Sequence, residues 1–391
     1  MKTLSTTLLF FSALSIGFAE TPAFLGEVVE IDQIEIGYGL ALTDVDGDKD
    51  IDIVLADKST VQWYENPGWK KHIIAKDLTE RDNVCIAARD IDGDGKCEIA
   101  VGGQWNFRET IKDGAVTYLV APEDRTQMWK PISLPHEPST HRMHWIKGAG
   151  DTYSLIVKPL RGKGTLDGVG KGLRILEYFK PEDPAAEWET RVVSDFLHLS
   201  HNFHPVNWDD DPEEELIVAA KEGVWYSDRV KGEWQTNRLT KDFAGELRDG
   251  ILPDGRRFIA TIEPMHGTRS AIYLQPEDGK GLWEQSTVLS DALVDGHAVA
   301  IDDFLGLGYD QIVVGWRAMH PKEPKGVPGI KFFTPHNAAI DSAGMLWIGK
   351  QISAEEVAVE DIKAADLNGD GKADIVAAAR QTKNLKIFFS K

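Results

Sequence analysis

The chain has 391 residues, with 63 acidic against 43 basic ones, and its net charge at pH 7 is −20. No stretch rich in Lys and Arg offsets this charge, so nucleic acid and anionic membranes are poor partners. Beyond the N-terminal segment no apolar run is long enough to cross a bilayer, which argues against membrane insertion.

Residues 1–19 have the pattern of a secretory signal peptide, in which Lys2 precedes an apolar stretch over 8–16 and Gly17 and Ala19 form a small-residue exit. We therefore expect residues 20–391 to be exported, to the periplasm or beyond. Cys85 and Cys97 flank one loop without facing each other across a hairpin, so unpaired buried thiols are favoured over a disulfide.

Three acidic loops of one design begin at Asp44, Asp90 and Asp366. Each places side-chain oxygens at positions 1, 3, 5 and 9, with Gly at position 4, between two apolar runs. Ca²⁺ takes six to eight hard oxygen ligands, and glycine lets the backbone wrap closely around the ion. The pattern predicts about three structural calcium ions in strand–loop–strand turns. The expected ligands are Asp44, Asp46, Asp48, Asp52, Asp90, Asp92, Asp94, Glu98, Asp366, Asn368, Asp370 and Asp374.

The strand after each loop recurs along the chain, and degenerate copies extend the three clear ones to seven. Its isoleucine stands at positions 53, 99, 156, 217, 259, 312 and 375, which are about 42 to 63 residues apart. That spacing is typical of four-stranded propeller blades. The last unit has no room for a fourth strand, whereas a strand near Gly26 precedes the first unit. We predict one all-β domain over 20–391, a seven-bladed β-propeller closed by this N-terminal strand.

The geometry of a blade predicts where the residues at each repeated position lie in the propeller. The loop between the first two strands lies on one face, so the acidic loops occupy that face. The first strand therefore begins, and the second ends, at the opposite face. These positions are rich in imidazole and in basic groups, and a concave mouth with convergent titratable groups is the default site.

We expect His141, His201 and His297 to bind Zn²⁺, Mn²⁺ or Fe²⁺ at this mouth, because imidazole suits these ions. Hydrogen-bonded loop histidines without a metal are the alternative. His204 or His266 would act as a base, and Lys158 or Arg317 would stabilise an oxyanion. The expected substrate-binding residues are Gln104, Trp105, Glu263, Trp316 and Arg380. For the two tryptophans, packing is an equal alternative to stacking on a sugar ring.

The acidic loops and their flanks resemble the FG-GAP or VCBS type of repeat, which implies the propeller fold and calcium. A narrower resemblance rests on Ser200-His-Asn-Phe-His204, on Glu263-Pro-Met-His266 and on Asp295-Gly-His297 with Trp316-Arg317. These segments are similar to the propeller domain of aldos-2-ulose dehydratase, whose family dehydrates keto-sugars such as 1,5-anhydrofructose. The resemblance implies a carbon–oxygen lyase acting on a keto-sugar.

Two classes of function remain open. An enzyme is favoured because the special residues differ from blade to blade and converge on one mouth. A non-catalytic carbohydrate- or protein-binding propeller is the alternative, since the fold itself does not decide function. Glycoside hydrolysis by Glu246 and Glu263 is less attractive, because the mouth holds more basic groups than acids.

Overall fold

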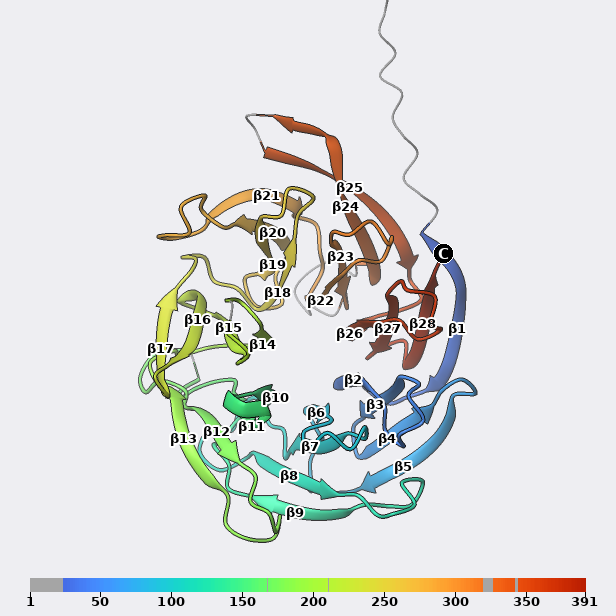
Figure 1. Cartoon of the computed structure of the whole chain (residues 1–391), viewed down its shortest axis with the longest axis vertical. Coiled ribbons are helices and arrows are strands. Elements are labelled where there is room, and N and C mark those ends of the chain that lie inside the picture. The colour runs from blue at the N-terminus through green and yellow to red at the C-terminus, as the bar shows by residue number, and fades with distance from the viewer. Residues whose placement is uncertain (1–23, 167, 210, 319–325, 342–343) are drawn as a thin grey trace, which may run out of the picture.

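The computed structural model describes residues 24–391 except 167, 210, 319–325 and 342–343, so the signal peptide expected at 1–19 lies outside the described residues. The described part forms 28 β-strands and one short 3₁₀ helix, η1 (Ala149–Asp151). The strands make seven four-stranded antiparallel sheets, arranged as blades around a central axis (Figure 1). The prediction of an all-β, seven-bladed β-propeller is confirmed.

Each blade runs from an inner strand at the axis to an outer strand at the rim, and the blades are numbered here in chain order. Blade 1 contains β2 (Gly39–Thr43), β3 (Asp52–Ala56), β4 (Thr60–Glu65) and β5 (Lys70–Lys76). Blade 2 contains β6 (Cys85–Arg89), β7 (Glu98–Gly103), β8 (Ala115–Val120) and β9 (Lys130–Leu134). Blade 3 contains β10 (Thr140–Lys147), β11 (Tyr153–Pro159), β12 (Ile175–Phe179) and β13 (Glu189–Ser194).

The second half of the ring follows the same plan. Blade 4 contains β14 (Phe203–Val206), β15 (Glu215–Ala220), β16 (Gly223–Val230) and β17 (Glu233–Arg238). Blade 5 contains β18 (Glu246–Ile251), β19 (Arg257–Glu263), β20 (Arg269–Leu274) and β21 (Glu284–Ser290). Blade 6 contains β22 (Gly296–Asp302), β23 (Gln311–Trp316), β24 (Gly329–Asp341) and β25 (Gly344–Ala354). Blade 7 contains β26 (Val359–Ala365), β27 (Asp374–Ala379), β28 (Asn384–Ser390) and β1 (Leu25–Gln33).

Blade 7 combines strands from both ends of the described chain. β1 pairs antiparallel with β28, with Val29 opposite Ile387, and forms the outer edge of the sheet (Figure 1). An apolar cluster that includes Leu40 and Ile53 on one side and Val376 and Leu385 on the other packs blade 7 against blade 1. Strand pairing and packing therefore both join the two ends of the ring.

The hydrophobic core is divided among the blade interfaces. Seven apolar clusters lie between the seven pairs of adjacent blades. The second strand of a blade is covered on both faces, which is why β3, β7, β15 and β27 are buried at every position and lack polar alternation. The outer strand β17 instead alternates between intermediate and exposed residues, as expected for a strand at the rim.

Three inner strands carry an irregularity close to their first residue. The register shifts between Thr140 and Arg142 in β10, between Gly296 and Ala298 in β22, and between Val359 and Asp361 in β26. Each shift leaves one residue without a cross-strand partner, namely His141, His297 and Glu360. A β-bulge re-aims a side chain that the regular pleat would direct elsewhere. The inner strands of the seven blades surround a central channel. All three bulges lie at the end of this channel that is opposite the acidic loops.

Candidate functional site

Three histidines from different segments meet at this end of the channel. His201 precedes β14, His266 lies on the β19–β20 loop, and His297 occupies the bulge of β22. One ring nitrogen from each lies within 4.8 Å of the others, and the Nε2 atoms of His201 and His266 are 2.9 Å apart. His266 therefore completes the group, where the sequence had placed His141.

Hydrogen bonds fix the orientation of two of the three rings. Nδ1 of His201 donates to the carboxylate of Glu246, which also accepts from Asn202. Nδ1 of His297 donates to the backbone oxygen of Glu360 at 2.6 Å. Both rings therefore keep Nε2 free of a proton, as metal-binding imidazoles do when the second nitrogen donates to an oxygen.

Burial keeps this cluster neutral. It lowers the pKa of His201 and of His297 well below the ordinary value, and the positive charge of Arg317 acts in the same direction. The pKa of His266 is lowered as well, by burial and by the neighbouring His201. A neutral imidazole is the form that binds a metal ion, so near neutral pH the histidines hold the required protonation state.

His266 connects the histidine cluster to the charged side chains that surround it. Arg317 lies with its guanidinium 3.3 Å from Nδ1 of His266 and donates to Asp295 at 3.1 Å. His266 and Asp295 have backbone φ angles of 53° and 61°, a left-handed conformation that non-glycine residues adopt rarely and that functional sites often retain. The loop conformation thus holds the imidazole over the end of the channel.

The donor set fits a transition-metal ion. Two nitrogen ligands about 2.1 Å from an ion lie about 3.0 Å apart at right angles and about 3.4 Å apart in a tetrahedral site, and the 2.9 Å between His201 and His266 is the length of the hydrogen bond that joins them. In the metal-free tautomer Nε2 of His266 donates to His201. Binding through that nitrogen would move the proton to Nδ1, where the nearest carboxylate oxygen, from Asp295, is 3.6 Å away.

His141 lies beside this group in a different environment. Its ring stacks on Trp105, with centroids 4.7 Å apart, and meets the edge of the His201 ring at the same separation. The residue is only 5% exposed, and neither ring nitrogen has a hydrogen-bond partner among the described residues. Buried polar atoms are rarely left unpaired, so His141 is poised to bond a molecule that enters the mouth.

Carboxylates and guanidinium groups form a network around the histidines. Glu360, from the bulge of β26, accepts from Arg317 at 2.7 Å and from Arg380 at 3.0 Å. Arg380 also lies over the ring of Tyr38, whose hydroxyl donates to Asp82 at 3.0 Å. Burial raises the pKa of Tyr38. The surroundings of the histidine cluster therefore combine the fixed positive charges of two arginines with a protonated phenol.

Five other predicted residues lie away from the three histidines. Lys158 is fully buried behind His201 and donates to the backbone oxygen of Ser200 at 2.5 Å. The other four also lie outside the histidine group, and three of them have side-chain partners of their own. His204 lies deeper in the channel beside His144, Glu263 forms an ion pair with Arg269, Gln104 contacts Asp113, and Trp316 donates to the backbone oxygen of Val327 at 2.6 Å.

Two acidic residues have positioning roles that the sequence did not predict. The carboxylate of Glu246, expected only as a less attractive candidate for glycoside hydrolysis, orients His201, and the backbone oxygen of Glu360 orients His297. Both lie at the start of an inner strand, which is also where the histidines were found. Their place in the repeat is therefore the signal that would have identified them.

The acidic loops share one hydrogen-bonding pattern at the opposite face. Asp90 accepts from the amides of Gly93 and Gly95 at 2.7 and 3.0 Å, and Asp44 and Asp366 accept from the equivalent amides of their loops. The carboxylates at positions 1, 3 and 5 of the first two loops lie within 4.8 Å of one another, as do those of Asp209, Asp211 and Glu215. Calcium itself stays a prediction.

The position-9 carboxylates are buried behind their loops. Asp52 accepts from the amides of Val45 and Asn66, each at 2.9 Å, and Glu98 accepts from Ile91 at 3.1 Å. Asp374 is placed in the same way by two amides. Burial raises the pKa of Asp52 and of Glu98 to about 7. These carboxylates hold the loops in shape through the backbone.

Both cysteines are free and buried, as the sequence predicted. Burial raises the pKa of each thiol. Among the described residues, no helix has the length and apolar character needed to cross a membrane.

Comparisons with solved structures identify the architecture. The chain is similar to a chain of the mitotic checkpoint complex (TM-score 0.56, 13% identity, 99% of both chains covered). It is similar to BBS1N in complex with ARL6DN (TM-score 0.55, 13% identity, 94% of this chain and 97% of that one). It also resembles the β-propeller domain of Cps50 (Swd1) from Myceliophteria thermophila (TM-score 0.53, 9% identity, 91% and 98%). Identities this low show the fold alone.

Sequence comparison identifies the type of repeat. No curated protein matches the chain. The FG-GAP-like repeat matches residues 44–101, which contain the first two acidic loops and the strands between them. This repeat match and the seven four-stranded blades together support an FG-GAP type of β-propeller.

Proposed function

We propose that this protein is an exported, metal-dependent lyase that dehydrates a keto-sugar at the mouth of the propeller. The convergence of His201, His266 and His297 carries the proposal, because it offers three neutral imidazoles, and a catalytic metal site uses three protein ligands and keeps one position open. Export rests on the segment 1–19, and the sugar class rests on the resemblance to aldos-2-ulose dehydratase.

The reaction needs a proton acceptor beside the carbon next to a ketone. When bound, a divalent ion at the three histidines supplies a Lewis acid that polarises the carbonyl oxygen. His141 is the proton acceptor in this proposal, since it is neutral and both its ring nitrogens are unpartnered. Its contact with Trp105 fixes the plane of the imidazole and adds an apolar wall to the mouth.

Negative charge develops on the carbonyl oxygen as the proton leaves. Arg317 stabilises that charge, because Asp295 and Glu360 hold its guanidinium rigidly beside His266. The hydroxyl group on the next carbon then departs with a proton as water. The proton that His141 has taken up is returned to this hydroxyl, so the elimination balances, whereas the phenol of Tyr38 donates to Asp82 and its raised pKa makes it a weak acid.

A binding module is the second candidate, and an exposed apolar surface favours it. Phe107, Ile111, Leu166 and Val169 are each more than half exposed, on two loops that a hydrogen bond from Arg161 to the backbone of Phe107 ties together. Similarly folded BBS1N is found in a complex with ARL6DN. A non-catalytic carbohydrate- or protein-binding propeller would use this exposed apolar surface.

Metal analysis with a substrate assay separates the two candidates. After dialysis, wild-type protein should retain about one equivalent of zinc, manganese or iron in addition to calcium, and it should dehydrate 1,5-anhydrofructose. His297→Ala should lose both properties and keep its circular dichroism spectrum. His198→Ala is the control, because His198 pairs with Glu222 outside the cluster. Calcium as the sole metal, with no turnover, would make the binding module the leading account.

A further inference from the structure

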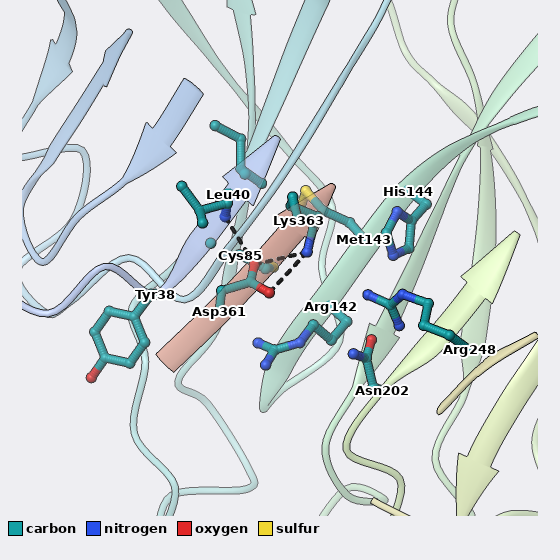
Figure 2. Close-up of a pocket in the computed structure, with 12 residues that line it drawn as sticks. Tyr38, Leu40, Cys85, Arg142, Met143, His144, Asn202, Arg248, Asp361 and Lys363 are labelled. Atoms are coloured by element: carbon teal, nitrogen blue, oxygen red, sulfur yellow. Dashed lines mark hydrogen bonds and ion pairs between the residues drawn. The ribbon is translucent and has the colours of Figure 1, made fainter. Parts of the chain in front are cut away.

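The central channel continues from the histidine cluster toward the acidic-loop face. A cavity of about 450 Å³ there is lined by inner-strand residues that include Arg89, His144, His204, Arg248 and Lys363. A smaller pocket nearer the cluster shares His144, Arg248 and Lys363 with it and adds Arg142 (Figure 2). A cavity of this volume is large enough for a small molecule.

Arg248 is a buried cation without an ion-pair partner. Its side chain belongs to a residue that is 8% exposed, and its guanidinium donates to the backbone oxygen of Leu247 at 2.6 Å. No carboxylate among the described residues lies within 4.0 Å of it. Arg142 is likewise held by backbone oxygens alone, those of Val84 and His141. Figure 2 shows both guanidinium groups without a bond to the other residues drawn.

The carboxylates nearby are already engaged. Asp361 accepts from Lys363 at 2.8 Å and from the amide of Leu40 at 2.9 Å (Figure 2). Glu214 pairs with Arg89 at 2.7 Å. Glu246 accepts its hydrogen bonds from His201 and Asn202. The charge of Glu246 attracts both arginines but offsets only one of them, so an excess of positive charge remains in the channel of a chain whose net charge is −20.

A buried charge without a partner is costly, and folded proteins normally pair such groups. The planar guanidinium matches the two oxygens of a carboxylate or phosphate, and bonds of this type are among the strongest hydrogen bonds in proteins. Nδ1 of His204 is a further buried atom without a partner among the described residues. Burial and Arg248 lower its pKa, so the ring stays neutral and able to donate.

We propose that this end of the channel binds a small ligand through a carboxylate or phosphate group, with Arg248 as the principal contact. Lys363 and Arg142 add positive charge on the opposite walls. Leu40 and Ile86 line both pockets and would contact the apolar part of the ligand. This oxyanion site is separate from the three histidines and does not depend on the lyase activity.

Isothermal titration with inorganic phosphate and with acetate tests the site, at low ionic strength and after dialysis to remove free calcium, which would otherwise precipitate with phosphate. Wild-type protein should bind at least one of the two anions, and Arg248→Gln should weaken that binding about 10- to 100-fold, because a charge-assisted bidentate contact is lost. The tighter anion identifies the group that the site prefers. Arg256→Gln is the matched control, because Arg256 pairs with Asp254 at the surface of the same β18–β19 hairpin.

Two further variants keep the test decisive. Lys363→Gln should also weaken binding, and it answers the question if Arg248→Gln does not fold. His297→Ala should bind phosphate as the wild type does, because the histidine cluster lies at the other end of the channel. The proposal fails if wild-type protein binds neither anion. It also fails if the affinity of Arg248→Gln is unchanged, or if His297→Ala alone abolishes binding.

Discussion

Glu246→Gln is the substitution that most directly tests how the histidine cluster is organised. Glu246 is 3% exposed and bridges Nδ1 of His201 and the amide of Asn202. The glutamine has the same shape, and its oxygen can still accept from His201. It carries no charge, however, and its NH₂ group then faces the NH₂ group of Asn202. One charge-assisted hydrogen bond, worth about 1.5–3 kcal/mol, is weakened, and one donor loses its acceptor.

The expected effect is a 10- to 100-fold loss of affinity for Zn²⁺ or Mn²⁺, the range for carboxylates that orient a metal-binding histidine. The loss has two sources, a less basic Nε2 and a less rigid ring. Competition with a chromophoric chelator measures the dissociation constant, and saturating calcium keeps the acidic loops from contributing to it. The melting temperature should fall by only a few degrees, because the substitution preserves shape and weakens one buried hydrogen bond.

Glu222→Gln provides the comparison. Glu222 bonds Nδ1 of His198 at 2.7 Å, which is the same type of contact, but His198 belongs to no group of potential ligands in the described part of the chain. Its affinity for the metal should equal that of the wild type. If Glu246→Gln also binds metal within twofold of the wild type, the carboxylate does not organise a metal site and our assignment of His201 is refuted.

Three other predictions concern stability. Glu177→Ala should lower the free energy of unfolding by about 3–5 kcal/mol in urea denaturation, because Arg229, Trp234 and Ser154 lose the acceptor that they share and Arg229 keeps only the 3.4 Å ion pair with Glu213; a change below about 1 kcal/mol would contradict this. Chelation of calcium should lower the melting temperature, since a site filled at 100 times its dissociation constant contributes about 2.7 kcal/mol; an unchanged melting temperature would argue against calcium in the loops. Burial and the charges of Arg248 and Lys363 lower the pKa of His144 and of His204, so the unfolded chain binds more protons below pH 6.5 and acid should destabilise the fold. Replacing both histidines with Gln should reduce that slope by up to about 2.7 kcal/mol per pH unit, as pH-dependent urea denaturation can measure.

The fold was predictable because it is repeated. A strand with Ile at its centre recurs in every blade, and a closed ring of such units leaves few alternatives. The place of the site followed from the same repeat, since the start of an inner strand lies opposite the acidic loop. His201 and His297 were found in this way.

What the sequence could not supply was the register of the strands. Glu263 ends the second strand of blade 5, as expected for a mouth residue, but it lies directly opposite Arg269 and is neutralised there. His266 belongs to a loop, and its backbone angle, which turns it toward His201, leaves no trace in the sequence. Glu360 reaches Arg317 through a bulge, and the sequence pattern of β26 does not reveal that irregularity.

The bulge in β10 explains how one inner strand contributes side chains both to the histidine cluster and to the charged pocket behind it. Arg142 and His144, two residues apart in the regular part of the strand, share a face and line the same pocket (Figure 2). His141 would point away from that face in an uninterrupted pleat, yet the shift in register lets it contact His201 instead. A single extra residue thus separates a neutral imidazole cluster at the mouth from a positively charged pocket behind it. Because His297 does not line the charged pocket, its replacement should leave anion binding there intact.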